Sequence, residues 1–155
     1  MTHSIEATLT ELGLSLPDAP APAANYVPFV QVGNLVHVSG QISSGPDGLI
    51  TGKLGADLSV EEGAAAARTC ALSLLAQAKA ATGGDLSKVK RLVKLVGFVN
   101  STAEFTDQPK VINGASDLMV EVMGDAGRHA RSAVSAVSLP LGVAVEIEAI
   151  FELNA

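Results

Sequence analysis

Apolar and polar residues alternate along three stretches of the chain, which is the pattern of half-buried β-strands. Residues 29–42 (FVQVGNLVHVSGQI) contain two such runs, with Gly33-Asn34 between them. Two residues of that kind between alternating runs predict a β-hairpin. A further strand is expected over residues 89–100, and residues 127–153 predict two strands around the turn LPLG at 139–142.

Helical spacing marks three other segments. Residues 4–13 carry apolar residues at intervals of three and four, which predicts a short amphipathic helix. A capping box, S-x-x-E at residues 59–62, starts a longer helix that Gly83 is placed to end. A third helix is expected over about residues 109–123, with a proline in its first turn and Gly124 at its end.

From residue 29 onward the elements follow the order β-β-α-β-α-β-β, so the sequence predicts an α+β fold. Right-handed crossovers place both long helices on one face of a mixed sheet. The other face stays uncovered. In the last strand one side is apolar and the other mixes apolar residues with Glu146, Glu148 and Glu152. Such a mixed face suits a subunit interface with polar sites better than bare solvent.

Length and composition fit one globular domain. The chain has 155 residues, of which 48% are hydrophobic and 17% charged. The segment 16–25 (LPDAPAPAAN) is rich in proline and alanine and should lie extended on the surface. We therefore divide the chain into an N-terminal extension, residues 1–25, which holds the short helix and this linker, and a single domain, residues 26–155.

Charge and cysteine content narrow the function classes. A net charge of -6 argues against a nucleic-acid surface, because phosphate binding relies on clustered Lys and Arg. No stretch is apolar enough to span a membrane, and the N-terminus does not resemble a secretory signal. The single cysteine, Cys70, fits a core position and a reducing cytoplasm, so we expect a cytoplasmic protein. The three histidines lack ligand spacing, which gives no metal site.

Three motifs in the same order resemble the RidA/YjgF family of imine and enamine deaminases, whose members are also described as L-PSP endoribonucleases. They are NYVPFVQVGNLVHVSGQI (25–42), VINGASDLM (111–119) and ARSAV…LP…VEIEAI (130–150). The resemblance covers roughly residues 26–154. It implies a chorismate-mutase-like fold and a homotrimer with ligand clefts between subunits.

The resemblance also assigns site residues. The family's carboxylate-binding arginine falls on Arg131 and its water-activating glutamate on Glu146. Residues expected to line the cleft are Tyr26, Ser39, Gly40, Asn113 and Ala133. Ala133 stands where the best-known deaminase branch has a cysteine, and with the N-terminal extension this indicates a divergent branch.

These residue types suit the hydrolysis of 2-imino or 2-enamino acids to 2-oxo acids and ammonia. Arginine pairs bidentately with a carboxylate, and a glutamate can act as general base towards water. We expect this pair to share one site, with the carboxylate of Glu146 buried beside Arg131. No cofactor or metal is required. A trimeric binder of a small carboxylate metabolite is the alternative function, and an endoribonuclease is disfavoured by the acidic balance.

Each assignment has a structural alternative. Arg131 can form an interface salt bridge, and Glu148 shares the strand face of Glu146, so the sequence cannot rank the two carboxylates. The aromatic ring of Tyr26 can serve as a hydrophobic plug. Ser39-Gly40 can be a β-bulge, and Asn113 an exposed helix residue. His129, two residues before the arginine, can help line the cleft.

Overall fold

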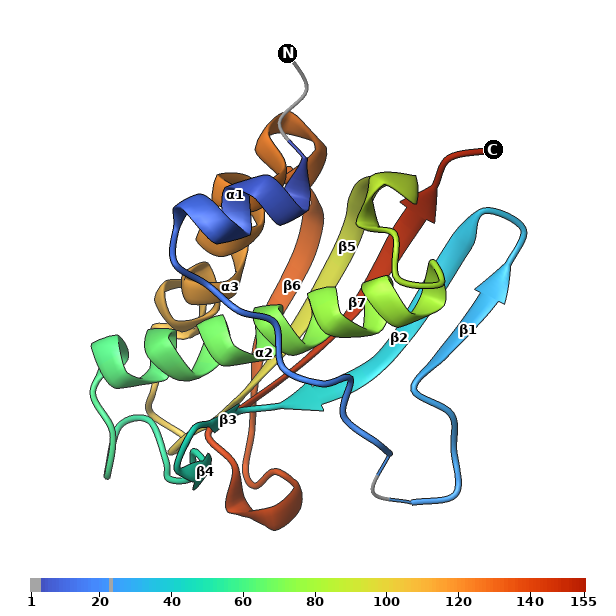
Figure 1. Ribbon diagram of the computed structural model, residues 1–155. Coiled ribbons are helices and arrows are strands. Elements are labelled where there is room, and N and C mark those ends of the chain that lie inside the picture. The colour runs from blue at the N-terminus through green and yellow to red at the C-terminus, as the bar shows by residue number, and fades with distance from the viewer. Residues whose placement is uncertain (1–3, 23) are drawn as a thin grey trace.

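A five-stranded mixed sheet forms the centre of the computed structural model, which describes residues 4–22 and 24–155 (Figure 1). Its strand order is β1-β2-β7-β5-β6, and only the β5–β6 pair is parallel. The strands are β1 (Phe29–Val32), β2 (Leu35–Ile42), β5 (Val89–Asn100), β6 (Ala130–Ala136) and β7 (Val145–Leu153). Two short strands, β3 (Ser44–Gly45) and β4 (Gly48–Leu49), pair separately.

Two long helices cover one face of this sheet, as predicted (Figure 1). They are α2 (Val60–Ala81) and α3 (Gln108–Met123). The capping box at the start of α2 is confirmed: the Glu62 amide donates to Ser59 Oγ at 3.1 Å, and the Ser59 amide donates to Glu62 Oε1 at 3.0 Å. Short 3-10 turns follow the main elements, η1 (Leu86–Lys88), η2 (Gly124–Gly127) and η3 (Pro140–Gly142).

The N-terminal segment packs on the helical layer. The predicted short helix is α1 (Ile5–Glu11), which contacts α3, and residues 14–22, hereafter the N-terminal strap, cross over α2 (Figure 1). The strap is extended and largely exposed, as expected for its proline-rich sequence. Under the strap, α2 is buried on all sides: every residue from Ser73 to Ala78 is buried. The sheet covers one side of this helix and the strap covers another.

The last two strands do not form a hairpin. The turn at η3 carries the chain past β5, so that β7 lies between β2 and β5 while β6 is an edge strand paired with β5 alone. The alternation predicted for β7 is confirmed, with Val145, Ile147 and Phe151 fully buried in the core. The intervening positions, which include Glu146 and Glu148, face the side of the sheet that the two helices leave uncovered.

Among the described residues, no helix is both long and apolar enough to cross a membrane.

Candidate functional site

The carboxylate of Glu146 lies in the wall of a cavity of about 400 Å³, hereafter the Glu146 cavity. This volume lies in the range of roughly 300–1,000 Å³ that is usual for small-molecule sites. The cavity forms at the free part of the β2 edge, because β1 pairs with β2 only from Leu35 to Val38. Its walls come from β2, α2, the η3 turn and the N-terminal strap, and most of them are apolar.

A bulge in β2 shapes the floor of this cavity. The pairing of β2 with β7 shifts between Val38 and Gln41, which makes Ser39-Gly40 a β-bulge, the structural alternative weighed from the sequence. Gly40 lines the cavity as well, so the two readings are compatible at that residue. A Cβ at position 40 would lie 2.9 Å from Cδ of Glu146, closer than van der Waals contact allows. Glycine therefore leaves room for the carboxylate.

Ser39 and Tyr26 play different parts beside the bulge. The hydroxyl of Ser39 donates to the Val27 carbonyl at 2.7 Å, and its amide donates to the Pro28 carbonyl at 2.9 Å. Ser39 thus fixes the segment that enters β1 and is not itself part of the cavity wall. Tyr26 lines the cavity and is 47% exposed, so it is a wall residue rather than a buried plug.

The environment of Glu146 disfavours its ionised form. Partial burial raises the pKa of the Glu146 carboxyl above its ordinary value, and the nearby charge of Glu148 raises it further. Glu148 itself is exposed, which separates two carboxylates that the sequence could not rank. Cys70 of α2 lies in the core on the helical side of the sheet. Burial raises the pKa of its thiol, and the charge of Glu146 raises it further. The prediction of a core cysteine is confirmed.

Arg131 lies in a second, more open recess between β6 and α3. Its guanidinium donates to Ser116 Oγ at 3.0 Å and to the Pro109 carbonyl at 3.2 Å. The residues that line this Arg131 recess are Asn113, Ser116, Val120, Arg128, His129 and Arg131. Asn113 is exposed, as the structural alternative has it, but it borders the same recess as the arginine.

A chain of hydrogen bonds holds the guanidinium of Arg131. His129 Nδ1 lies 2.6 Å from the Gly127 carbonyl, which can only accept, so this nitrogen carries the proton. In neutral histidine Nε2 then accepts from the hydroxyl of Ser116, 2.9 Å away. The Ser116 oxygen in turn accepts from Arg131. His129 therefore lines the recess and also orients the serine that positions the arginine, a role that sequence reasoning missed.

Within one chain, Arg131 and Glu146 point to opposite faces of the sheet. Arg131 pairs with Leu95, which faces the buried helical side, whereas Glu146 pairs with Phe98. Leu95 and Phe98 are three residues apart in β5, so their side chains alternate to different faces. Within one chain the structure therefore does not bring Glu146 beside Arg131, and their meeting in a cleft between subunits stays a prediction. The pKa of Glu146 responds to burial and Glu148 instead.

Ala133, in the position of the family's cysteine, faces the same side as Arg131. It pairs with Gly97 and packs against the hydrophobic core under α3. It borders neither the Glu146 cavity nor the Arg131 recess. Beside it, Ile112 of α3 fills the space above Gly97, the β5 residue with which Ala133 pairs.

Several wall residues were not singled out from the sequence. Pro20, Ala21 and Pro22 of the N-terminal strap line the Glu146 cavity, as do Ser73 and Leu141. The η3 turn places Leu141 at φ 58°, a left-handed conformation that is unusual for leucine. A proline-rich segment and a turn have no periodic pattern in the sequence. Only the folded structure therefore shows that these residues meet at one cavity.

Acidic, cysteine and histidine side chains do not cluster for a metal. Over residues 4–22 and 24–155, no group of three or more such side chains is arranged to hold an ion.

Comparison with known proteins decides the family. A family model described as "YjgF/chorismate_mutase-like, putative endoribonuclease" matches residues 6–153, which is most of the chain. The chain belongs to the YjgF/RidA family. The match begins within α1. The chorismate-mutase-like α+β fold predicted from the sequence is confirmed by the similarity to solved structures of this family.

Three proteins are similar to this YjgF/RidA chain over most of its length. Protein TCP17 of Trypanosoma cruzi is 54% identical over 97% of this chain and 94% of that protein. Atu1372 of Agrobacterium tumefaciens, a protein of unknown function, is 51% identical, with a TM-score of 0.90 over 97% of this chain and 92% of that one. A 2-iminobutanoate/2-iminopropanoate deaminase of Dermatophagoides farinae is 31% identical over 88% of this chain and 92% of that enzyme.

Proposed function

We propose that this protein is a cofactor-independent deaminase that hydrolyses 2-imino or 2-enamino acids to 2-oxo acids and ammonia. The observation that carries the proposal is the Glu146 carboxylate, which faces a largely apolar cavity of small-molecule size with its pKa raised by burial. A carboxylate whose pKa is raised towards the working pH is an effective general base. The similarity to a named imine deaminase supports the same activity.

Arg131 supplies the other half of the proposed site. Its guanidinium is positioned by Ser116 and Pro109 at the edge strand of the sheet, and arginine recognises a carboxylate through two parallel hydrogen bonds. Because Arg131 and Glu146 face opposite sides within one chain, the pair can serve one ligand only across a subunit interface. We therefore place the site in clefts of a homotrimer. The uncovered sheet face, where Val134 of β6 is 46% exposed, is the surface available for assembly.

The chemistry needs only these two groups and water. Arg131 of one subunit holds the substrate carboxylate, and Glu146 of the next takes a proton from water as the water oxygen bonds to the imine carbon. As the C=N bond becomes a C–N bond, Glu146 passes this proton to the nitrogen, which gives a carbinolamine. Glu146 then takes the proton of the new hydroxyl group and delivers it to the amino nitrogen. The C–N bond breaks as the C=O bond forms, and ammonia leaves with the 2-oxo acid as product. A general base contributes about 10²–10⁴ in rate, and no redox step or cofactor is needed.

A hydrolysis assay tests this proposal. An amino acid oxidase generates 2-imino acids in place, semicarbazide traps what remains, and wild type is compared with Arg131→Ala and Glu146→Gln. The wild-type protein should deplete the trappable imine, and both variants should lose this activity. Glu148→Gln is the matched control, because this exposed carboxylate lies outside the cavity wall and has a smaller influence than burial on the pKa of Glu146, so most of the activity should remain. If wild type leaves the trapping rate unchanged for every parent amino acid, the proposal fails.

A non-catalytic binder is the second candidate, favoured by one observation. Ala133 replaces the family's cysteine and is packed against the core, so this chain lacks a polar group at that place. A binder should keep its affinity for a small carboxylate in the Glu146→Gln variant, measured by calorimetry, and show no turnover in wild type. Ribonuclease activity is disfavoured because a net charge of -6 offers little attraction to phosphate.

A further inference from the structure

The N-terminal strap does more than cover α2. Its last residues, Pro20, Ala21 and Pro22, line the Glu146 cavity. Pro20 lies 57 positions before Gln77, the α2 residue that it contacts. Part of the cavity wall is thus built from a segment that has no part in the sheet.

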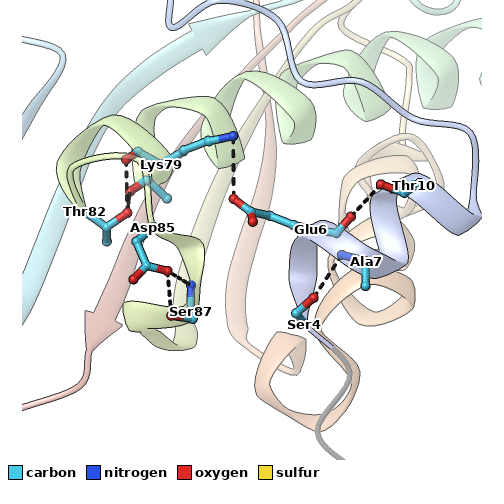
Figure 2. A network of polar contacts seen from close by, with 9 residues as sticks. Ser4, Glu6, Ala7, Thr10, Lys79, Thr82, Asp85 and Ser87 are labelled. Carbon is cyan, nitrogen blue, oxygen red and sulfur yellow. Dashed lines mark hydrogen bonds and ion pairs between the residues drawn. The ribbon is translucent and has the colours of Figure 1, made fainter.

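A buried glutamine fastens this segment. Gln77 of α2 is 1% exposed, and its Nε2 donates to the Pro20 carbonyl at 2.7 Å. Leu14 and Leu16 of the strap pack on the core before this point. At the start of the segment Glu6 of α1 pairs with Lys79 of α2 at 3.5 Å (Figure 2). That ion pair is exposed and contributes little, so the strap depends on the two leucines and on Gln77.

The same glutamine connects the strap to the bulge beside the carboxylate. Gln77 Nε2 lies 3.4 Å from Gln41 Oε1, and Gln41 Nε2 donates to the Ser39 carbonyl at 2.9 Å. Gln41 is buried as well. Because a buried amide that loses its partner is costly, this path holds the strap and the Ser39-Gly40 bulge in one arrangement. Gln77 therefore contacts both the strap, at Pro20, and the β2 residue that holds the bulge, Gln41.

The chemistry of the cavity wall indicates what it accepts. Beside the strap, the wall includes Ile42, Leu49 and Leu141, and Glu146 is its one ionisable carboxylate. An anionic group is repelled from this cavity, since the described residues of its wall include Glu146 but no Lys, Arg or His. The part of a ligand that enters must be uncharged, and an apolar side chain gains most from burial there.

We propose that the N-terminal strap is the specificity wall of the Glu146 cavity, that it selects ligands with an apolar side chain larger than methyl, and that Gln77 is the positioning residue that holds it. This inference rests on the proposed function in one respect, that the carboxylate of the ligand lies at Arg131 of another subunit. The cavity then receives the side chain of the imino acid, and the strap sets how large it can be.

The test compares imines made from leucine and from alanine by the oxidase and semicarbazide assay. Wild type should prefer the leucine imine by at least about tenfold in kcat/KM, as expected for several buried methylene groups. Gln77→Leu, which removes the donor to Pro20, should reduce this ratio. Ala21→Phe should reduce it too, because the added ring occupies the cavity from an exposed strap position that does not disturb the core.

Ala19→Phe is the matched control. Ala19 belongs to the same strap and is exposed, but it borders a different recess with Lys79 and Gly84. The control should keep the wild-type ratio. Amide hydrogen exchange of residues 14–22 gives a readout independent of activity, and Gln77→Leu should exchange faster there whereas Ala21→Phe should not. A ratio near one in wild type, or one that neither Gln77→Leu nor Ala21→Phe changes, overturns the inference.

Binding of product analogues separates this inference from the proposed function. Calorimetry compares 4-methyl-2-oxopentanoate with pyruvate on wild type and Ala21→Phe. If no imine is hydrolysed but the larger 2-oxo acid binds more tightly, and only with alanine at position 21, the deaminase proposal fails and the specificity wall stands. If imines are hydrolysed and the two 2-oxo acids bind alike, the wall fails and the deaminase stands.

Discussion

The two candidate halves of the site differ in how complete they are within one chain. The Glu146 cavity is lined by several parts of its own subunit, including the N-terminal strap, and its carboxylate is partly desolvated. The Arg131 recess is open, and its guanidinium is held by a serine and a carbonyl rather than by an acid. The first half is shaped for an apolar group and the second for an anion. A ligand with both features needs both halves.

Mixing two inactive variants gives the largest expected effect. Arg131→Ala and Glu146→Gln, each purified alone, should lose about 10²–10⁴ in kcat/KM. Unfolded together and refolded, they should recover part of the wild-type rate, because some interfaces then combine an intact Arg131 from one chain with an intact Glu146 from another. No recovery, in a mixture that sedimentation shows to contain assemblies larger than the 15.7 kDa chain, would place both residues in one subunit's site.

Enlarging Gly40 should disturb the Glu146 half alone. A Cβ at this position would overlap the carboxylate of Glu146, so Gly40→Ala should displace the base and reduce kcat by roughly 10²-fold, the usual cost of a misplacement of about 1 Å. Gly45→Ala is the control, because its Cβ would meet Ile50 Cδ1 at an ordinary 3.7 Å. Equal losses in both variants would show a general effect on the fold rather than on the base.

Removing the hydroxyl of Ser116 should weaken the Arg131 half. Ser116→Ala takes away one acceptor of the guanidinium and the donor to His129, at about 1 kcal/mol for a hydrogen bond. We expect KM to rise about fivefold, which is that free energy expressed as a ratio, with kcat nearly unchanged. Asp117→Asn, at the next and exposed position of α3, should leave KM as it is. A fall in kcat alone would contradict the positioning role.

The pH dependence of stability gives the smallest effect and reports on the Glu146 half. Since burial raises the pKa of Glu146 in the folded chain, the protonated form favours folding, and that contribution is lost as the pH rises through the folded-state pKa. We therefore compare the Arg131→Ala, Glu146→Gln double variant with the Arg131→Ala single variant. The free energy of unfolding of the double variant should rise relative to that of the single variant as the pH increases from about 4 to about 8. Urea denaturation measures it.

The same measurement in the presence of Arg131 sharpens the comparison between the two halves. A guanidinium from another subunit that approaches the carboxylate lowers its pKa, so the pH-dependent difference between Glu146→Gln and wild type should be smaller than in the Arg131→Ala background. A difference that is flat with pH in both backgrounds would contradict the raised pKa.

Local patterns in the sequence predicted most of the elements. The hairpin at Gly33-Asn34, the capping box of α2 and the alternation of β7 depend on neighbouring residues, and the structure confirms all three. The family motifs named Arg131 and Glu146, whose roles remain predictions. These features share one property, which is that the residues that specify them lie within a few positions of one another.

What the sequence could not supply is long-range. The insertion of β7 between β2 and β5 depends on strand pairing across the whole chain, and the turn before it resets which face each side chain takes. The opposite orientation of Arg131 and Glu146 follows from that pairing and not from their spacing. The contact of Pro20 with Gln77 spans 57 positions and joins a segment without periodicity to a helix.

The exposure of the N-terminal strap has a consequence for how this protein can diversify. Residues 17 to 21 are exposed and make little of the core, so most substitutions there change the free energy of unfolding by less than about 0.5 kcal/mol. This part of the cavity wall can therefore change without repacking the core, whereas the wall residues in β2, α2 and β7 cannot. If the strap selects the ligand as proposed, ligand preference can change among related chains while the sheet, the helices, Arg131 and Glu146 stay the same.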